Sequence, residues 1–190
     1  MFGFSLANLS ALRARGVLGM NRRNIAYISR YNPRQHFPLV DNKLKTKQLA
    51  LEYDVVVPEL ISVIDNQHDV NFLEQRLLGR DGFCIKPAKG SGGKGILVIQ
   101  QCHQGQYCRS NGQVISLDEI KRHVSNILAG LFSLGGTVDV AVVEALIEGD
   151  ENIARYSHEG VPDLRLIVFR GIPIMAMMRL ACAASQGKAN

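Results

Sequence analysis

Residues 83–99, FCIKPAKGSGGKGILVI, contain the pattern that decides the fold. Two apolar runs, 83–85 and 96–99, are bounded by glycine, which is typical of strands and predicts a strand, a basic loop and a second strand. Glycine permits positive φ and close approach, so several N–H groups can converge on phosphate oxygens while lysine supplies positive charge. The alternative is a flexible hairpin tip with solvated lysines. The loop and its base hold Gly90, Gly92, Gly93, Gly95, Lys86, Lys89 and Lys94.

Known glycine motifs fit this loop only in part. The spacing Gly90-x-Gly92-x-x-Gly95 matches the dinucleotide fingerprint, but that motif requires a helix after its third glycine, and a β-rich run follows here. Walker A is excluded because Gly95, and not Ser or Thr, follows Lys94. A glycine loop within a hairpin resembles the arrangement that covers ATP phosphates in protein kinases, although Lys86 precedes the loop instead of following it.

Length and composition indicate a globular protein. The chain has 190 residues, of which 46% are hydrophobic, enough for one ordinary domain or two small ones. No apolar run approaches the roughly 20 residues that span a bilayer, so we expect a soluble protein without a membrane span. The cysteines Cys84, Cys102, Cys108 and Cys182 lack C-x-x-C spacing, which indicates reduced thiols and a cytoplasmic location. Cys102, His103 and Cys108 suggest zinc only weakly, because no fourth ligand is evident nearby.

Positive charge is concentrated at the N-terminus. Residues 1–47 carry nine Lys and Arg against one Asp, a net charge of +8, whereas the whole chain carries +5. Such a segment can bind nucleic acid, anionic lipid or nucleotide phosphates, or act as a transit peptide. Structural residues such as Tyr31, Pro33 and Pro38 favour a folded basic face. Aromatic residues are too few for a base-stacking platform, so nucleic acid is the less favoured partner.

Helices are predicted mainly before residue 80. Leucine spacing predicts a helix over 5–15 that ends at Gly16, and residues 20–38 lack sustained periodicity and are interpreted as a connector. Asp41 can cap a helix that runs to about Tyr53. A short helix is predicted from Pro58, with the sequence PELISVI, and another over 70–78.

The second half mixes strands with one long helix. Asn111-Gly112 predicts a tight β-turn. Ser116 and Glu119 form a capping box for a helix to about residue 131. Its predicted buried stripe is Ile120, Val124, Ile127, Leu128 and Leu131.

Three further strands are predicted after that helix. Residues 138–147 form an apolar strand interrupted by Glu144, which predicts burial on both faces or the wall of a cleft. A polar loop over 148–162 precedes strands at 163–170 and 174–180. Asp163 and Arg165 lie on one face of their strand, and Arg179 lies on the same face if the two strands pair in register. These residues form either a surface ion pair or a nucleotide contact.

Five segments in this order and spacing carry a family resemblance: residues 41–60, 83–98, 142–151, 162–180 and 186–190. Together they resemble the ATP-grasp superfamily and, within it, the α-L-glutamate-ligase-like proteins related to the ribosomal-protein glutamate ligase. The N-terminal GVLGMNRRN and YNPR are similar to this subgroup too. The resemblance implies an α+β ATP-grasp fold, in which antiparallel-sheet subdomains flank an ATP cleft. We expect a basic helix and connector over 1–40, an N-terminal subdomain over 41–143 and an incomplete C-terminal subdomain over 144–190.

The resemblance also implies roles for individual residues. Lys43 or Lys45 would approach the ATP phosphates, and Lys86 would bind the α-phosphate and the adenine side. Adenine would be bound by the hinge residues Glu144, Ala145 and Leu146. Asp163 would lie near the ribose, and Arg165 and Arg179 near the γ-phosphate and the acyl substrate. The loop over the β- and γ-phosphates would be Gly90, Ser91, Gly92, Gly93, Lys94 and Gly95, and a terminal segment that touches the nucleotide would contain Lys188 and Asn190.

The implied activity is ATP-dependent ligation of a carboxylate to an amine through an acyl phosphate, with ATP and Mg²⁺ as cofactors. The family's magnesium carboxylates match no residue here, so we expect those ligands in a missing C-terminal part and a truncated chain that turns over poorly. Alternatives are a nucleotide-binding module or pseudoenzyme, and a basic anion- or nucleic-acid-binding protein. The acyl and amine substrates and the oligomeric state are left open.

Overall fold

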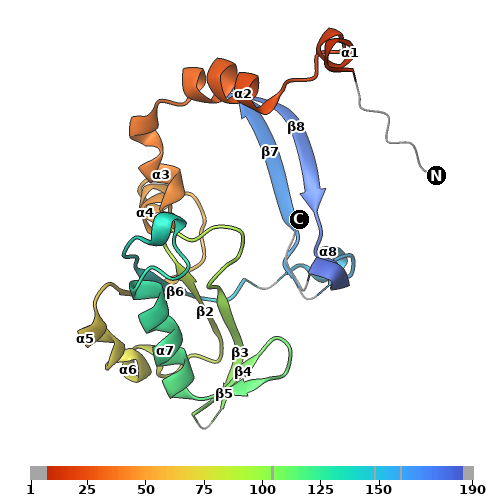
Figure 1. The fold of residues 1–190 in the computed structure, drawn as a ribbon. Helices are drawn as coiled ribbons and strands as arrows, with labels where there is room; N and C mark the ends of the chain where they lie inside the picture. The colour runs from red at the N-terminus through yellow and green to blue at the C-terminus, as the bar shows by residue number, and fades with distance from the viewer. Residues whose placement is uncertain (1–7, 104, 148, 159, 186–190) are drawn as a thin grey trace, which may run out of the picture. The chain divides into compact units, whose positions relative to one another are not determined.

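The computed structural model describes residues 8–103, 105–147, 149–158 and 160–185 (Figure 1). The chain forms two compact units, Met1–Pro38 and Leu39–Asn190. Among the described residues, no helix is both long enough and apolar enough to cross a bilayer. The expected boundary between residues 143 and 144 falls inside a strand of the second unit and stays a prediction.

The first unit is helical over most of its described length. It contains α1 (Leu9–Ala14), α2 (Met20–Arg23), the π-helical segment η1 (Asn24–Ser29) and the short η2 (Arg34–His36). Residues 20–38, interpreted from the sequence as a connector, are thus largely helical, and their connecting role stays a prediction. A π-helix places more residues in each turn than an α-helix, so its apolar residues do not recur at the 3.6-residue spacing.

The second unit is built on a six-stranded antiparallel sheet. Its strand order is β1 (Leu60–Ile64), β6 (Ala141–Glu144), β2 (Phe83–Pro87), β3 (Leu97–His103), β4 (Gln106–Arg109) and β5 (Val114–Ile115). The predicted strand, loop and strand is confirmed, because β2 pairs with β3 and Phe83 lies opposite Ile99. The α+β class with antiparallel sheets is likewise confirmed.

The helix predicted from Pro58 is wrong, because residues 60–64 form the edge strand β1. This strand pairs with β6, with Val63 opposite Val142. Three of its five residues are β-branched, and such side chains pack well on a pleated surface. The helix-initiating signal of Pro58 is therefore overridden by pairing with a strand about 80 residues later in the sequence.

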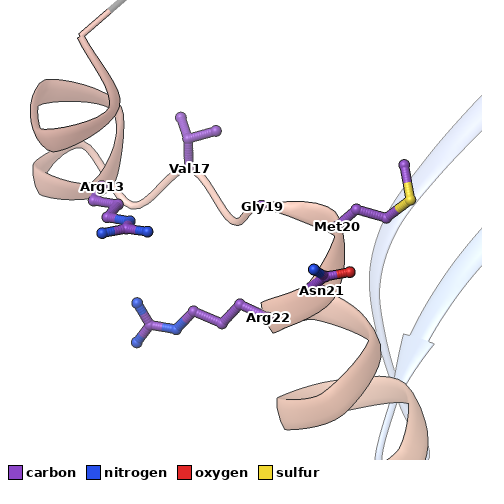
Figure 2. Close-up of a pocket in the computed structure, with 6 residues that line it drawn as sticks. All are labelled: Arg13, Val17, Gly19, Met20, Asn21 and Arg22. Atoms are coloured by element: carbon purple, nitrogen blue, oxygen red, sulfur yellow. The ribbon is translucent and has the colours of Figure 1, made fainter.

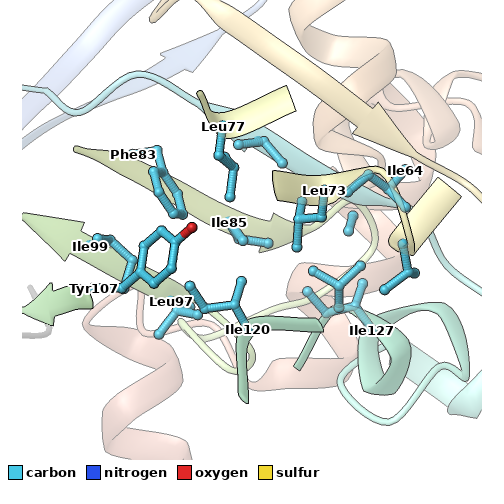
Figure 3. Packing of buried hydrophobic residues seen from close by; sticks show 14 of the residues in the cluster. Ile64, Leu73, Leu77, Phe83, Ile85, Leu97, Ile99, Tyr107, Ile120 and Ile127 are labelled. Carbon is cyan, nitrogen blue, oxygen red and sulfur yellow. The ribbon is translucent and has the colours of Figure 1, made fainter. Parts of the chain in front are cut away.

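One face of the sheet carries the hydrophobic core (Figure 3). Phe83, Ile85 and Pro87 of β2 are buried on this face, whereas Cys84 and Lys86 alternate onto the other. Full burial of a side chain such as Phe83 contributes about 1.5–3 kcal/mol. The core is covered by α5 (Gln67–Val70), α6 (Leu73–Leu77) and α7 (Leu117–Leu128). The helix predicted over 70–78 is present in shorter form as α6, and Val70 ends the separate helix α5.

Helix α7 follows its predicted sequence signals. Ser116 accepts a hydrogen bond from the N–H of Glu119, and the Glu119 carboxylate accepts one from the N–H of Ser116 at 2.8 Å. The buried stripe of Ile120, Val124, Ile127 and Leu128 is confirmed. Leu131 is wrongly included in it, because the helix ends at Leu128 and the Leu131 side chain is 68% exposed.

Gly130 closes α7 where two backbone segments meet. Its φ of 81° lies in the left-handed region, and a Cβ added there would overlap the backbone oxygen of Thr137. A side chain at residue 130 would therefore displace the segment that leads into β6. The short 3₁₀ turn η3 (Leu134–Gly136) lies in the same connection.

The loop between β2 and β3 contacts α7 near the end of the loop that leads into β3. His123 Nε2 lies 2.9 Å from the carbonyl oxygen of Gly95, with which it forms a hydrogen bond. A Cβ at Gly95 would lie 2.5 Å from Phe132 Cγ, so only glycine permits this approach. Burial lowers the pKa of His123, and the positive charge of Arg109 adds to this, whereas the hydrogen bond to Gly95 acts in the opposite direction.

A separate two-stranded sheet contains β7 (Asp163–Phe169) and β8 (Ile172–Arg179). Asp163 pairs with Arg179, so the predicted register is confirmed. No residue of this hairpin is buried within the part of the chain that the structure describes. The preceding polar segment contains one helical turn, α8 (Glu151–Ala154), and the hairpin is followed by the 3₁₀ turn η4 (Ala183–Ser185).

Gly130→Ala should destabilise the protein more than a matched glycine substitution. Both Gly130 and Gly112 have positive φ, but a Cβ at Gly112 meets open space. We expect Gly112→Ala to lower the free energy of unfolding by about 1 kcal/mol through backbone strain alone. Gly130→Ala should lower it by about 3 kcal/mol, because overpacking adds to that strain. Chemical denaturation of both variants measures the difference, and equal losses would contradict the close approach.

His123 should make stability depend on pH. Its pKa in the folded protein is below the usual value of 6.5, so the unfolded chain binds the proton more readily. The free energy of unfolding should thus be unaffected by His123 above pH 6.5 and fall as the pH drops below that value. His123→Phe keeps a ring beside Phe132 and removes the titration. Denaturation between pH 5 and pH 8 should show a shallower acid loss in the variant, and parallel curves would refute this role.

Candidate functional site

Charged side chains gather on the sheet face opposite the core. Cys84 of β2 lies opposite Glu144 of β6, and Lys86 lies opposite Val142, so Lys86 and Glu144 are diagonal neighbours on one face. The ammonium of Lys86 forms an ion pair with Glu144 Oε2. Glu144 is only 3% exposed, so the predicted burial of this strand is confirmed and its carboxylate lies among cations.

Helix α4 (Lys43–Glu52) supplies two further lysines to the same carboxylate region. Its N-cap is Asn42 and not the predicted Asp41, which ends α3 (Pro38–Asp41); Asn42 Oδ1 accepts from the N–H groups of Leu44 and Lys45. Lys43 and Lys47 are four residues apart and therefore share a helix face.

Lys47 is the most buried of these lysines. It is 5% exposed, its Nζ donates to the carbonyl oxygen of Pro58, and it lies 2.9 Å from Glu144 Oε1. No motif in the sequence singles out Lys47. The signal that could have found it is its spacing from Lys43, which places both ammonium groups on one side of α4.

Lys43 links α4 to the glycine-rich loop. Its backbone N–H donates to Ala88 O at 2.8 Å, and its Nζ donates to the carbonyl oxygen of Gly90. Burial lowers the pKa of Lys43, and the positive charge of Lys86 lowers it further, while Asp139 and Glu144 act in the opposite direction. Lys45 of the same helix is exposed. Of the two predicted lysines, the structure therefore brings Lys43 to the loop.

The loop is held at its start by a buried carboxylate. Asp139 is 1% exposed and accepts hydrogen bonds from the Lys89 N–H at 3.1 and 3.0 Å and from Ser133 Oγ at 2.5 Å. Lys89 Nζ donates to the Val138 carbonyl oxygen at 2.9 Å. Asp139 is a second residue that no motif indicates, although it is a lone acid in front of an apolar strand.

Between these attachments the loop is exposed. The residues from Ser91 to Lys94 are exposed, and the Lys94 N–H donates to Ser91 O at 3.2 Å. Gly92, Gly93 and Gly95 have φ values of 61°, 71° and 75°, as a turn of this kind requires. Gly90 is needed for a different reason, because a Cβ there would overlap the ring of Pro87.

Glu144 retains capacity to accept a hydrogen bond. Its Oε1 is buried and within ion-pair distance of Lys47, but this approach lacks hydrogen-bond geometry within the described part of the chain. The N–H of Ala145, the residue after Glu144, donates to Glu59 O at 3.0 Å. Leu146 is half-buried and its Cδ1 lies close to Gly82.

The predicted hairpin residues lie in the other sheet. Arg179 forms an ion pair with Asp163, while Arg165 is exposed and pairs with Met177. Within the described ranges, no hydrogen bond or ion pair joins these three residues to the lysines around Glu144. The structure therefore does not bring the two predicted groups together. Lys188 and Asn190 lie outside the described residues.

Cys84 lies on this face and is a free thiol. Burial raises the pKa of Cys84 to about 11, with Glu144 adding to the rise and Lys86 opposing it. Cys84, Cys102 and Cys108 form no disulfide. Considering only the described residues, no group of three His, Cys, Asp or Glu side chains is arranged to hold a metal ion.

Lys47→Met should destabilise the fold because it leaves Glu144 buried with one cation fewer. We expect a loss of about 3 kcal/mol in the free energy of unfolding. Lys45→Met on the same helix should change it by less than about 0.5 kcal/mol. The double variant Lys47→Met/Glu144→Met should recover most of the loss, since a buried pair can be replaced by apolar residues. Urea denaturation compares all three, and equal effects of the two lysine substitutions would contradict this account.

Comparison with known proteins identifies the fold family. The family model of sugar-transfer associated ATP-grasp domains matches residues 22–190. No curated protein and no solved structure shows significant similarity to the chain. The predicted ATP-grasp superfamily is confirmed by this match, whereas the closer assignment to glutamate-ligase-like proteins stays a prediction. Because the matched region spans most of the sequence, the chain belongs to the sugar-transfer associated ATP-grasp family.

Proposed function

We propose that the chain binds ATP between the glycine-rich loop and the lysines around Glu144. The observation that carries this proposal is that Lys47 and Lys86 pair with the buried carboxylate of Glu144, while Lys43 of the same helix as Lys47 donates to the glycine-rich loop at Gly90. These three cations lie near two carboxylates, Glu144 and Asp139, which leaves one positive charge uncompensated. Burial is the largest cause of the lowered pKa of Lys43, and the positive charge of Lys86 adds to it. A polyphosphate would supply the missing negative charge. Binding of phosphate is the usual function of lysines beside a glycine loop.

Within this proposal each residue has a separate role. Lys43 and Lys86 would bind phosphate oxygens, and exposed N–H groups between Ser91 and Lys94 would cover the terminal phosphates. Glu144 would accept a hydrogen bond from the amino group of adenine, helped by the carbonyl of Ala145. A guanine presents a carbonyl oxygen at that position, which the carboxylate would repel. The site therefore favours ATP over GTP.

The reaction class that we propose is ATP-dependent ligation of a carboxylate to an amine. The carboxylate oxygen attacks the γ-phosphorus and releases ADP, which forms an acyl phosphate. The amine nitrogen then attacks the acyl carbon and releases inorganic phosphate, with loss of a proton, which forms the amide. Such transfers require charge neutralisation and alignment and no covalent protein nucleophile. This assignment rests on the resemblance to glutamate ligases, and Asp163, Arg165 and Arg179 stay proposed contacts for ribose, γ-phosphate and acyl substrate.

Magnesium does not fit the described carboxylates of this face. Magnesium requires free oxygen ligands. Glu144 is engaged by two lysines, and Asp139 is occupied by Ser133 and the Lys89 N–H. No step of the reaction is therefore assigned to a metal held by these residues.

The same observation favours a second function, nucleotide binding without turnover. The lysines and the loop can hold ATP even where the described carboxylates leave no position for a metal. Measurement of ADP release with Mg²⁺, a set of carboxylates and a set of amines separates the two functions. Amide formation supports the ligase, whereas tight ATP binding without ADP release supports a nucleotide-binding module.

Lys86→Ala should weaken ATP binding, and it should also lower the free energy of unfolding, by less than Lys47→Met does, because buried Glu144 keeps Lys47 as a partner. The Lys86 side chain is partly exposed beside Glu144, so its removal takes away a positive charge that would bind phosphate and removes little packing. We expect the Kd for ATP to rise about thirtyfold, which corresponds to about 2 kcal/mol. Lys121→Ala on α7, which packs on the opposite face of the sheet, should change the Kd less than twofold. Titration calorimetry gives both values, and an unchanged Kd in Lys86→Ala would rule out the proposed pocket.

A further inference from the structure

The described part of the first unit carries only positive charge. Residues 8–38 contain six arginines, Arg13, Arg15, Arg22, Arg23, Arg30 and Arg34, but no lysine, aspartate or glutamate. Arginine presents a planar set of donors that binds phosphate in a bidentate manner and is more weakly hydrated than lysine. The unit is therefore suited to a phosphate-bearing partner.

This unit has no core of its own among its described residues. None of residues 8–38 is buried, and the side chains of Leu9, Met20 and Ile25 are 71%, 73% and 73% exposed. Short helices gain most of their stability from packing an apolar face against another surface. A partner of this unit must thus accept aliphatic side chains as well as arginines.

Arginine and apolar side chains meet in one hollow. A recess of about 500 Å³ between α1 and α2 is lined by Arg13, Val17, Gly19, Met20, Asn21 and Arg22. In Figure 2 the side chains of Arg13 in α1 and Arg22 in α2 extend toward the same side, whereas the side chain of Val17 points away from their guanidinium groups. Neither guanidinium makes a hydrogen bond or an ion pair with another described residue. Both are available to one anion.

We propose that the first unit lies on a bilayer rich in anionic phospholipid, with a lipid phosphate bound between Arg13 and Arg22. The aliphatic side chains Val17, Met20 and Ile25 then enter the region between headgroups and acyl chains. A basic segment with exposed apolar residues is the composition that binds membrane interfaces without spanning them. Nucleic acid would satisfy the arginines but leave the aliphatic side chains in water.

The proposal is independent of nucleotide binding, because its residues belong to the other compact unit. It also gives a function to the arginines of residues 8–38, which have no role in the proposed ATP site. Attachment to a membrane surface would concentrate the second unit near lipid-linked or membrane-bound molecules.

Vesicle sedimentation with the full chain tests the proposal. Vesicles of phosphatidylcholine with 30 mol% phosphatidylglycerol should bind the protein in low salt, and pure phosphatidylcholine should bind it much more weakly. Arg13→Gln/Arg22→Gln should lower the partition coefficient about thirtyfold, since each arginine near an anionic surface contributes roughly a fivefold to sixfold change. The matched control Lys121→Gln/Arg122→Gln removes the same charge from α7 and should change binding less than twofold.

A spectroscopic measurement tests insertion separately from charge. The chain contains no tryptophan, so Met20→Trp creates a single reporter in the proposed contact. Its emission should shift to shorter wavelength with anionic vesicles and not with phosphatidylcholine alone. No shift, equal effects of the two double variants, or an oligonucleotide that binds more tightly than the vesicles and displaces them would each overturn the proposal.

Discussion

The burial of Glu144 against the ammonium of Lys47 is the constraint on which the rest of the site depends. An ionised carboxylate removed from water is costly unless cations and donors surround it. The negative charge of Glu144 requires a nearby cation. Lys47 supplies it, and α4, which carries Lys47, therefore lies on the sheet face opposite the core. The same helix then brings Lys43 to the start of the loop. One buried charge thus joins a helix, a sheet face and a loop.

The two faces of the six-stranded sheet differ in character, because one is apolar and the other carries charged side chains. Alternation along β2 sends Phe83 and Ile85 to the core and Cys84 and Lys86 to the opposite face. The core face needs apolar volume, whereas on the charged face Lys47 and Lys86 share the carboxylate of Glu144. Charge placed at the expense of stability is frequent where a protein binds a ligand.

Local patterns predicted some parts of this fold and missed others for physical reasons. The glycine-rich hairpin and α7 follow from local signals, namely glycine boundaries and the Ser116–Glu119 capping box, and both are present in the structure. The local signal of Pro58 predicts a helix where the structure has β1. The strand forms because it pairs with β6, which is distant in the sequence. Lys47 and Asp139 escape prediction for the same reason, since their partners Glu144 and Lys89 lie far away in the sequence. The grouping of Lys43, Lys86, Gly90 and Glu144 was predictable only through the family resemblance.

The glycine-rich loop is fastened at both ends, by Asp139 at Lys89 and by His123 at Gly95. Conformational freedom is therefore confined to the four residues from Ser91 to Lys94. A segment of this length can bend or tighten, but it cannot swing away as a hinged flap does. Exchange of a bound molecule would then proceed past the loop tip without separation of β2 from β3, so the sheet can stay intact through repeated rounds of loading and release.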